Sequence, residues 1–118
     1  METRRKTRQI LVGDDRTGRV AIGGGAPIAV QTMCAGYTHD IDACVAEINR
    51  YHAAGAELVR VAVPERKDTE ALKSIIPQVK VPIVADVHFH YQRALEARSD
   101  RTHRLFALSC IPSAATRT

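Results

Sequence analysis

Three short apolar runs, separated by comparable intervals, constrain most strongly what this chain can fold into. They occupy residues 27–33, 58–63 and 82–89, and each is rich in β-branched residues and almost continuously apolar at its start. Strands that are buried on both faces of a parallel sheet have this composition, whereas strands with one solvated face alternate apolar and polar residues. The sequence therefore predicts three parallel strands.

An amphipathic helix is predicted between the first two runs, over residues 40–54. Asp40 and Asp42 suit the positive N-terminal end of such a helix, and Gly55 suits a left-handed residue just after its last turn. The apolar residues follow the spacing of one helical face: Ile41, Cys44, Val45 and Ile48.

A second helix is expected between the second and third runs. Asp68 is positioned to cap this helix and Pro77 to end it. Its apolar face consists of Ala71, Leu72, Ile75 and Ile76. A third helical stretch covers residues 91–97, so the predicted order is β-α-β-α-β-α with right-handed crossovers.

A β-hairpin is predicted ahead of this unit, with strands at 10–13 and 20–23 flanking a turn. Three parallel strands cannot close a (β/α) barrel, which takes eight strands and about 250 residues. An open sheet of three strands would leave long edges exposed. We therefore expect an α/β fold, an incomplete barrel built of its first three βα units, with the hairpin plugging the N-terminal end of the barrel.

Two segments are expected in the chain: residues 1–97 as the N-terminal part of the barrel, and 98–118 as a tail that is disordered or not its natural continuation. Beyond Ala97 the periodicity stops, residues 105–108 are apolar but isolated, and no fourth strand is predicted. One hypothesis is a frameshift or a gene-model error. Resequencing the gene tests it, because an intact reading frame ending at Thr118 would remove the idea.

Composition excludes several classes of protein. No stretch reaches the 18 or so apolar residues that span a membrane, and the charged N-terminus lacks the apolar run of a secretory signal. The net charge is +4, but the first ten and the last 21 residues contribute +3 each and the body carries −2, so no basic stripe suits a nucleic acid. Three widely spaced cysteines form neither a disulfide framework nor a metal motif, which favours a reducing, cytoplasmic setting.

Arg60 is the most informative polar residue, because it interrupts an otherwise apolar strand. Burying a guanidinium without a partner is costly. One interpretation is an internal salt bridge with a carboxylate of a neighbouring strand, such as Asp86. The other is an anion clamp, since arginine binds phosphate through two parallel hydrogen bonds. Both interpretations are compatible.

Other candidates lie near strand ends, where parallel α/β proteins bind their ligands. Asp86 and His88 are two residues apart and share one strand face, where they could orient one another, transfer a proton or bind a metal; a hydrogen-bonded pair without chemistry is the alternative. Gln31 and Met33 belong to the first strand. Residues 23–25 are three glycines, but they precede a strand rather than a helix and do not predict a phosphate loop. The remaining histidines considered, His39 and His52, are expected at solvated surface positions.

Four stretches, in this order, resemble a known family. They are residues 4–8, 22–33, 59–64 and 82–89, with the sequences RRKTR, IGGGAPIAVQTM, VRVAVP and PIVADVHF. Together they resemble the N-terminal portion of the 4-hydroxy-3-methylbut-2-enyl diphosphate synthases, the iron–sulfur enzymes of the non-mevalonate isoprenoid (terpenoid) pathway. The resemblance extends over residues 4–97, and a generic barrel would not share all four stretches.

The resemblance implies a TIM-type barrel followed by a C-terminal domain that holds a 4Fe-4S cluster. Members are oxidoreductases that reduce 2-C-methyl-D-erythritol 2,4-cyclodiphosphate, opening its ring and expelling water to give 4-hydroxy-3-methylbut-2-enyl diphosphate. Electrons arrive from ferredoxin or flavodoxin. In the family's homodimer, the barrel of one subunit meets the cluster domain of its partner.

Carried over by position, Arg60 resembles a barrel arginine that meets the diphosphate. Asp86 and His88 resemble the polar pair that lines the same pocket, and Gln31 and Met33 its first strand. These five are the expected substrate-binding residues, and no catalytic residue is assigned in this chain.

The family's cluster ligands and further diphosphate-binding residues belong to regions beyond residue 97. The cysteines of this chain do not match those ligands and are assigned to no metal: Cys34, Cys44 and Cys110. The chain is therefore expected to be a fragment that is inactive alone. The alternative is a stand-alone module that binds a phosphate ligand through Arg60 without redox chemistry; a different phosphate-binding barrel enzyme, such as a pterin synthase, is disfavoured by the four ordered stretches.

Overall fold

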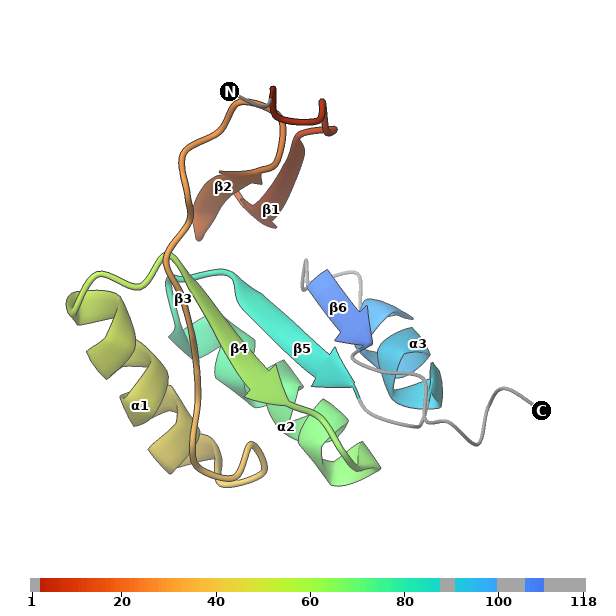
Figure 1. The fold of residues 1–118 in the computed structure, drawn as a ribbon. Helices are drawn as coiled ribbons and strands as arrows, with labels where there is room; N and C mark the ends of the chain where they lie inside the picture. The colour runs from red at the N-terminus through yellow and green to blue at the C-terminus, as the bar shows by residue number, and fades with distance from the viewer. Residues whose placement is uncertain (1–2, 88–90, 100–105, 110–118) are drawn as a thin grey trace.

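The computed structural model of the 118-residue chain describes residues 3–87, 91–99 and 106–109. They form two sheets (Figure 1). One is an antiparallel hairpin of β1 (Ile10–Asp14) and β2 (Gly18–Ile22), and the other is a parallel sheet with the strand order β3-β4-β5-β6. In the described part of the chain, no helix is long and apolar enough to cross a membrane.

The parallel sheet is built from strands and helices that alternate along the chain, as its sequence predicts. The strands are β3 (Gln31–Met33), β4 (Leu58–Ala62), β5 (Ile83–Val87) and β6 (Phe106–Ser109). They are joined by α1 (Ile41–Ala53), α2 (Arg66–Ile75) with the short 3-10 helix η1 (Ile76–Gln78), and α3 (Tyr91–Ser99). Every pairing in this sheet is parallel.

Alternate residues of the central strands form the core. Val59, Val61 and Val63 belong to one buried cluster that also contains Ile48 of α1 and Leu72 of α2. The same cluster takes in the alternate residues of β5: Ile83, Ala85 and Val87. Because side chains alternate across a strand, the intervening residues of β4 and β5 face away from these helices. The helices therefore cover one face of the sheet, and the other face carries Arg60 and Asp86 among the apolar residues Leu58, Ala62 and Val84.

The fourth strand, β6, corrects the expectation that no strand follows the third helix. It pairs with β5 in parallel register, Val84 opposite Phe106 and Val87 opposite Ser109. Helix α3 also continues past residue 97, to Ser99. The apolar residues 105–108 were interpreted as isolated because no amphipathic stripe leads into them. The segment boundary at residue 97 stays a prediction, and most of residues 98–118 lie outside the described part.

Helix α2 begins earlier than its sequence predicts. Glu65, not Asp68, is the N-cap, and the backbone N–H of Glu65 donates to Oδ2 of Asp68 at 3.1 Å. Asp68 thus serves as the third helical residue of a capping box, a role that Glu or Gln usually fills. The expected end of α1 is confirmed, since Gly55 follows it with a φ of +112°. The first strand is shorter than expected, and residues 27–30 precede it without forming part of it.

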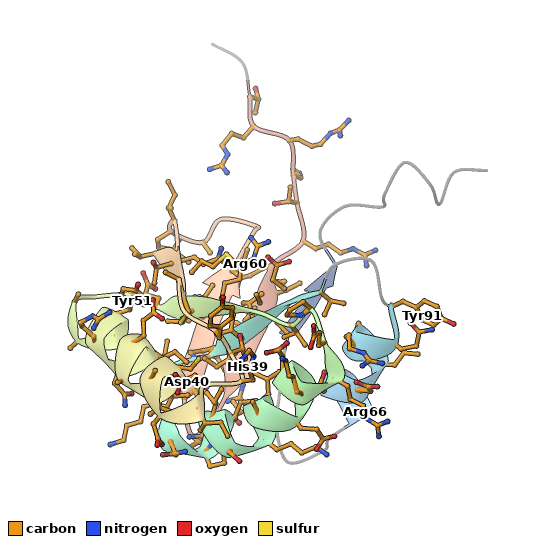
Figure 2. All side chains as sticks on the ribbon, turned by 90° about the horizontal axis from the view of Figure 1, so that it is seen from below. His39, Asp40, Tyr51, Arg60, Arg66 and Tyr91 are labelled. Atoms are coloured by element: carbon orange, nitrogen blue, oxygen red, sulfur yellow. The ribbon has the colours of Figure 1, made fainter. Side chains whose placement is uncertain are left out.

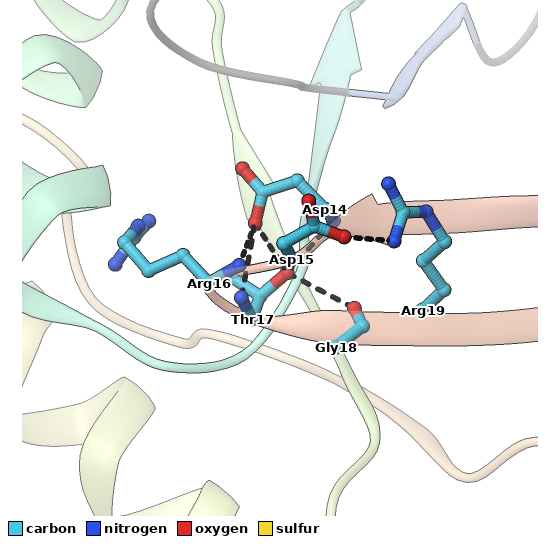
Figure 3. Close-up of polar contacts among 6 residues, drawn as sticks. All are labelled: Asp14, Asp15, Arg16, Thr17, Gly18 and Arg19. Carbon is cyan, nitrogen blue, oxygen red and sulfur yellow. Dashed lines mark hydrogen bonds and ion pairs between the residues drawn. The ribbon is translucent and has the colours of Figure 1, made fainter.

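The hairpin turn comprises three residues between paired Asp14 and Gly18 (Figure 3). Oδ1 of Asp14 accepts hydrogen bonds from the backbone N–H groups of Arg16 and Thr17, at 3.0 and 2.9 Å. The N–H of Thr17 contributes most to lowering the pKa of the Asp14 carboxyl, because it stabilises the charged form. Gly18 has a φ of +78°, which completes a three-residue hairpin of the kind that needs a left-handed residue.

The hairpin lies beyond the ends at which β4 and β5 begin (Figure 1). Nη1 of Arg16 donates to the backbone carbonyl of Val79 at 2.6 Å, and its Nη2 donates to the carbonyl of Ile76 at 2.8 Å. Ile76 begins η1 and Val79 directly follows it, ahead of β5. The predicted hairpin is therefore confirmed, and one arginine ties it to the N-terminal end of the sheet.

We expect Arg16→Ala to lower the free energy of unfolding by about 1 kcal/mol, because it removes two charge-assisted hydrogen bonds from a partly exposed group. Arg19→Ala is the matched control: this arginine lies in the same hairpin but pairs only with the exposed Asp15. The free energy of unfolding of Arg19→Ala should be close to that of the wild type. Urea unfolding measures both, and equal effects of the two variants would contradict the docking role of Arg16.

Candidate functional site

The sheet face away from α1 and α2 carries the polar residues that its sequence singled out. Met33 lies opposite Arg60 in the ladder of β3 and β4, and Asp86 lies opposite Ala62 in that of β4 and β5. Residues that are opposite one another in a parallel ladder share a face, and so do residues two apart on one strand. Gln31, Met33, Arg60 and Asp86 therefore lie on the same face, the one that would face the interior of a closed barrel.

Arg60 and Asp86 form a close ion pair at the centre of this face. Nη2 of Arg60 donates to Oδ2 of Asp86 at 2.9 Å. The Asp86 side chain is 3% exposed and that of Arg60 21%. Arg60 lies in the middle of β4 rather than at its end, and its length lets it reach a carboxylate near the end of β5. The predicted internal salt bridge is confirmed, and the Arg60 side chain as a whole remains partly exposed.

The other predicted site residues differ in how the structure places them. Met33 is 43% exposed and Gln31 is exposed, both on the edge strand β3. Gln31 begins this strand, so it is farther from the strand end than expected. His88 lies outside the described residues. That these five residues bind the substrate stays a prediction.

Glu47 of α1 is a structural anchor of the site that the sequence did not point to. Its Oε2 accepts hydrogen bonds from the N–H of Ala35 at 2.8 Å and the hydroxyl of Tyr51 at 2.6 Å, and its Oε1 accepts one from the N–H of Gly36 at 3.2 Å. Burial raises the pKa of the Glu47 carboxyl, but these hydrogen bonds outweigh it and the net pKa lies below its ordinary value. Glu47 thus fixes the loop that follows β3.

His39 is a second such residue: it is exposed, as its sequence predicts, but it also contacts a buried carboxylate. Its Nδ1 lies 3.1 Å from Oδ1 of Asp68, a carboxylate only 2% exposed, and its ring stacks on Tyr37. Figure 2 labels His39 and Arg60, viewed from the side toward which the strands run. His39 and Asp68 border a cavity of about 180 Å³ that Pro64 and Lys67 also line. Of these two residues, only Asp68 has a signal in the sequence, because the spacing Glu65-x-x-Asp68 is that of a capping box. The contact of Asp68 with His39, in the loop before α1, depends on tertiary structure.

The described residues offer no fit to a metal or an iron–sulfur cluster. Within residues 3–87, 91–99 and 106–109, no three or more His, Cys, Asp or Glu side chains gather so that they could hold a metal ion. Cys34 and Cys44 are buried in the apolar core rather than directed at the polar face. No chemical step is therefore derived through a cluster held by these residues.

Parallel strands joined by helices, a hairpin at the N-terminal end of the sheet and an arginine–carboxylate pair on the face away from the helices fit the first part of an α/β barrel protein. A family model, described as the GcpE TIM-barrel domain, matches residues 7–105. The chain therefore belongs to the GcpE family. This finding confirms the resemblance stated from its four sequence stretches.

Curated relatives carry one name, 4-hydroxy-3-methylbut-2-en-1-yl diphosphate synthase (flavodoxin). A relative from Granulibacter bethesdensis is 54% identical over 94 residues, and one from Rhodospirillum rubrum is 54% identical over 95 residues. Each alignment covers 80% of this chain and 23% of the relative. A relative from Nitratiruptor is 53% identical over 91 residues, which are 77% of this chain and 24% of that protein. The chain thus spans about a quarter of the length of these relatives.

Proposed function

We propose that this chain supplies the first part of the substrate-binding barrel of a 4-hydroxy-3-methylbut-2-en-1-yl diphosphate synthase, in which flavodoxin donates the electrons. The proposal rests on family membership and on the name of relatives that are about half identical to this chain. The substrate would be 2-C-methyl-D-erythritol 2,4-cyclodiphosphate. The iron–sulfur cluster, the homodimer and the cytoplasmic setting that the resemblance implies belong to the same proposal.

The Arg60–Asp86 pair is the single observation that carries the proposed role of this segment. Arginine stays charged and presents its N–H groups in a planar fork that matches two phosphate oxygens. Asp86 accepts a hydrogen bond from that fork at 2.9 Å, on the face that a barrel would enclose. An anchored guanidinium loses little freedom on binding an anion. We therefore assign Arg60 to a diphosphate oxygen and Asp86 to the orientation of Arg60.

A chimera tests this proposal. Residues 7–97 of this chain replace the matching segment of the Granulibacter bethesdensis relative, and the same segment from the Rhodospirillum rubrum relative serves as the graft control. We expect both chimeras to form the product. If the control is active and the chimera with this chain's segment is folded but inactive, the proposal is wrong.

Within the active chimera, Arg60→Lys should lower kcat/KM by at least about tenfold, mainly through KM, because lysine keeps the charge beside Asp86 but lacks the bidentate fork. Arg19→Lys, in the hairpin at the other end of the sheet, should leave the kinetics unchanged. If Arg60→Lys leaves KM unchanged, Arg60 does not bind the diphosphate.

The alternative function, a stand-alone module for a phosphate ligand, is favoured by the same pair and tested on the 118-residue chain. Calorimetric titration with the cyclic diphosphate measures binding directly. Saturable binding that Arg60→Ala abolishes, together with an inactive chimera, would favour the module. An active chimera together with no binding by the isolated chain favours a part of the synthase.

A further inference from the structure

A basic arm, residues 4–8 with the sequence RRKTR, precedes the hairpin and lies against the glycine loop of residues 23–25. The hydroxyl oxygen of Thr7 accepts a hydrogen bond from the N–H of Gly24 at 2.9 Å. Figure 1 shows the arm and the loop at the open end of the hairpin, away from the turn that contacts the sheet. The arm is therefore attached to the rest of the protein and is not a free tail.

The glycine loop can lie this close to the arm because it carries no side chains. Gly23 has a φ of +85°, and a Cβ at this position would come within 2.3 Å of the carbonyl oxygen of Arg8. Gly24 has a φ of +60°, and a Cβ there would meet the Cβ of Gln9 at 3.0 Å. Residues with a side chain rarely adopt such φ values. Backbone conformation and close approach thus both fix the arm against the loop.

Between the basic arm and the glycine loop lies an open cavity of about 450 Å³. Its described lining consists of Arg4, Arg5, Lys6, Thr7, Gly24 and Gly25. No acidic residue is among them, and none of the three cations makes an ion pair within the described part of the chain. Like charges that share one cavity repel one another. An anion bound between them would replace this repulsion by attraction.

The cavity offers several hydrogen-bond donors but no apolar wall. An arginine fork binds phosphate through two parallel hydrogen bonds. The hydroxyl of Thr7 accepts from Gly24 and keeps its own proton to donate, and the N–H of Gly25 donates to no partner among the described residues. Cavities for organic ligands are lined mainly by apolar and aromatic side chains, which the described lining lacks. The ligand that fits is therefore a compact polyanion.

We propose that the basic arm and the glycine loop form a binding site for an anion of two or more linked phosphate groups, of which inorganic pyrophosphate is the simplest. Its charges match the three cations, and its oxygens match the donors of the cavity. Because the arm is already held by the glycine loop, it loses less freedom on binding than a mobile tail would. Arg60 does not line this cavity. The inference is therefore independent of the proposed function.

Calorimetric titration of the 118-residue chain with inorganic pyrophosphate tests the proposal. We expect one saturable site, with weaker binding of orthophosphate and sulfate, which carry fewer charges. Added salt should weaken the binding, because the cations are exposed. In proton–nitrogen correlation spectra of the labelled chain, the N–H signals of Gly24 and Gly25 should shift and saturate at the same pyrophosphate concentrations.

Three variants separate this cavity from the total charge of the arm and from the sheet face. Arg5→Gln should raise the Kd for pyrophosphate by about fivefold, because it removes a charge-assisted hydrogen bond. Arg8→Gln is the matched control, since it removes the same charge from the same arm but its side chain does not line the cavity. Its Kd, like that of Arg60→Lys, should equal the wild-type value. Circular dichroism checks that each variant is folded.

Four results would overturn the proposal. One is the absence of saturable pyrophosphate binding by the folded chain. Equal effects of Arg5→Gln and Arg8→Gln would show that binding follows total charge, and a raised Kd in Arg60→Lys would move the anion to the sheet face. A short single-stranded oligonucleotide that displaces pyrophosphate at a lower concentration than pyrophosphate itself needs would assign the arm to a nucleic acid instead.

Discussion

Asp86→Ala should lower the free energy of unfolding by about 2–4 kcal/mol, the largest single effect that we expect from the candidate site. The substitution removes a carboxylate that is 3% exposed and that accepts a hydrogen bond from Arg60 at 2.9 Å. The guanidinium then loses its charged neighbour inside the sheet, and breaking a buried pair from one side costs more than the pair contributes. This expected loss is at the lower end of the usual range for breaking a buried ion pair, because the Arg60 side chain is 21% exposed. Urea unfolding measures it.

A double substitution separates the loss of a contact from the burial of a charge. Arg60→Met with Asp86→Leu removes both charges and keeps apolar volume, so we expect it to cost less than Asp86→Ala alone. Asp15→Ala is the surface control, since its ion pair with Arg19 involves a side chain 92% exposed, and it should have no measurable effect. A double variant that is less stable than Asp86→Ala would contradict a pairing between Arg60 and Asp86.

The element order and the polar face could be predicted from sequence because both depend on local periodicity. Val59, Val61 and Val63 alternate with Arg60, and a side chain that interrupts an apolar strand must face the side that the helices do not cover. The same alternation places Asp86 beside it. The ion pair was therefore predictable once two neighbouring parallel strands were assumed.

What the sequence did not predict depends on contacts between distant segments. Glu47 has no helical signature that distinguishes it from an exposed glutamate, and its partners Ala35 and Gly36 precede it by 12 and 11 residues. His39 and Asp68 are 29 residues apart and meet only when the loop after β3 packs against the first turn of α2. Such contacts follow from tertiary packing, which local propensity does not encode.

The two ends of the sheet were predicted least well, for different reasons. Residues 27–30 are apolar and were assigned to the first strand, but strand β3 begins only at Gln31. Proline at position 27 has no N–H for a ladder, which limits how early this strand can start. At the other end, β6 has only four residues, Phe106–Ser109, too few for periodicity to distinguish a strand from an apolar stretch of loop.

Glu47→Gln should destabilise the chain at neutral pH by about 1–3 kcal/mol, because a carboxylate that accepts three hydrogen bonds is replaced by an amide whose NH₂ group cannot accept any. The pKa of Glu47 lies below its ordinary value of 4.5 in the folded chain. Its contribution is therefore fully present above about pH 4.5 and is lost as the pH falls through the folded-state pKa. The difference in stability between the wild type and Glu47→Gln should shrink over that acidic interval.

The matched control for this pH dependence is Glu70→Gln, on the exposed surface of α2, where the glutamate meets only Lys73 at 3.2 Å. Its stability should follow that of the wild type at every pH, because a solvated surface pair contributes little. Urea unfolding at a series of pH values from neutral down over roughly three pH units follows both variants. A constant gap between wild type and Glu47→Gln throughout would mean that Glu47 acts through its shape alone, and the loop after β3 would then owe its position to packing rather than to a charged clamp.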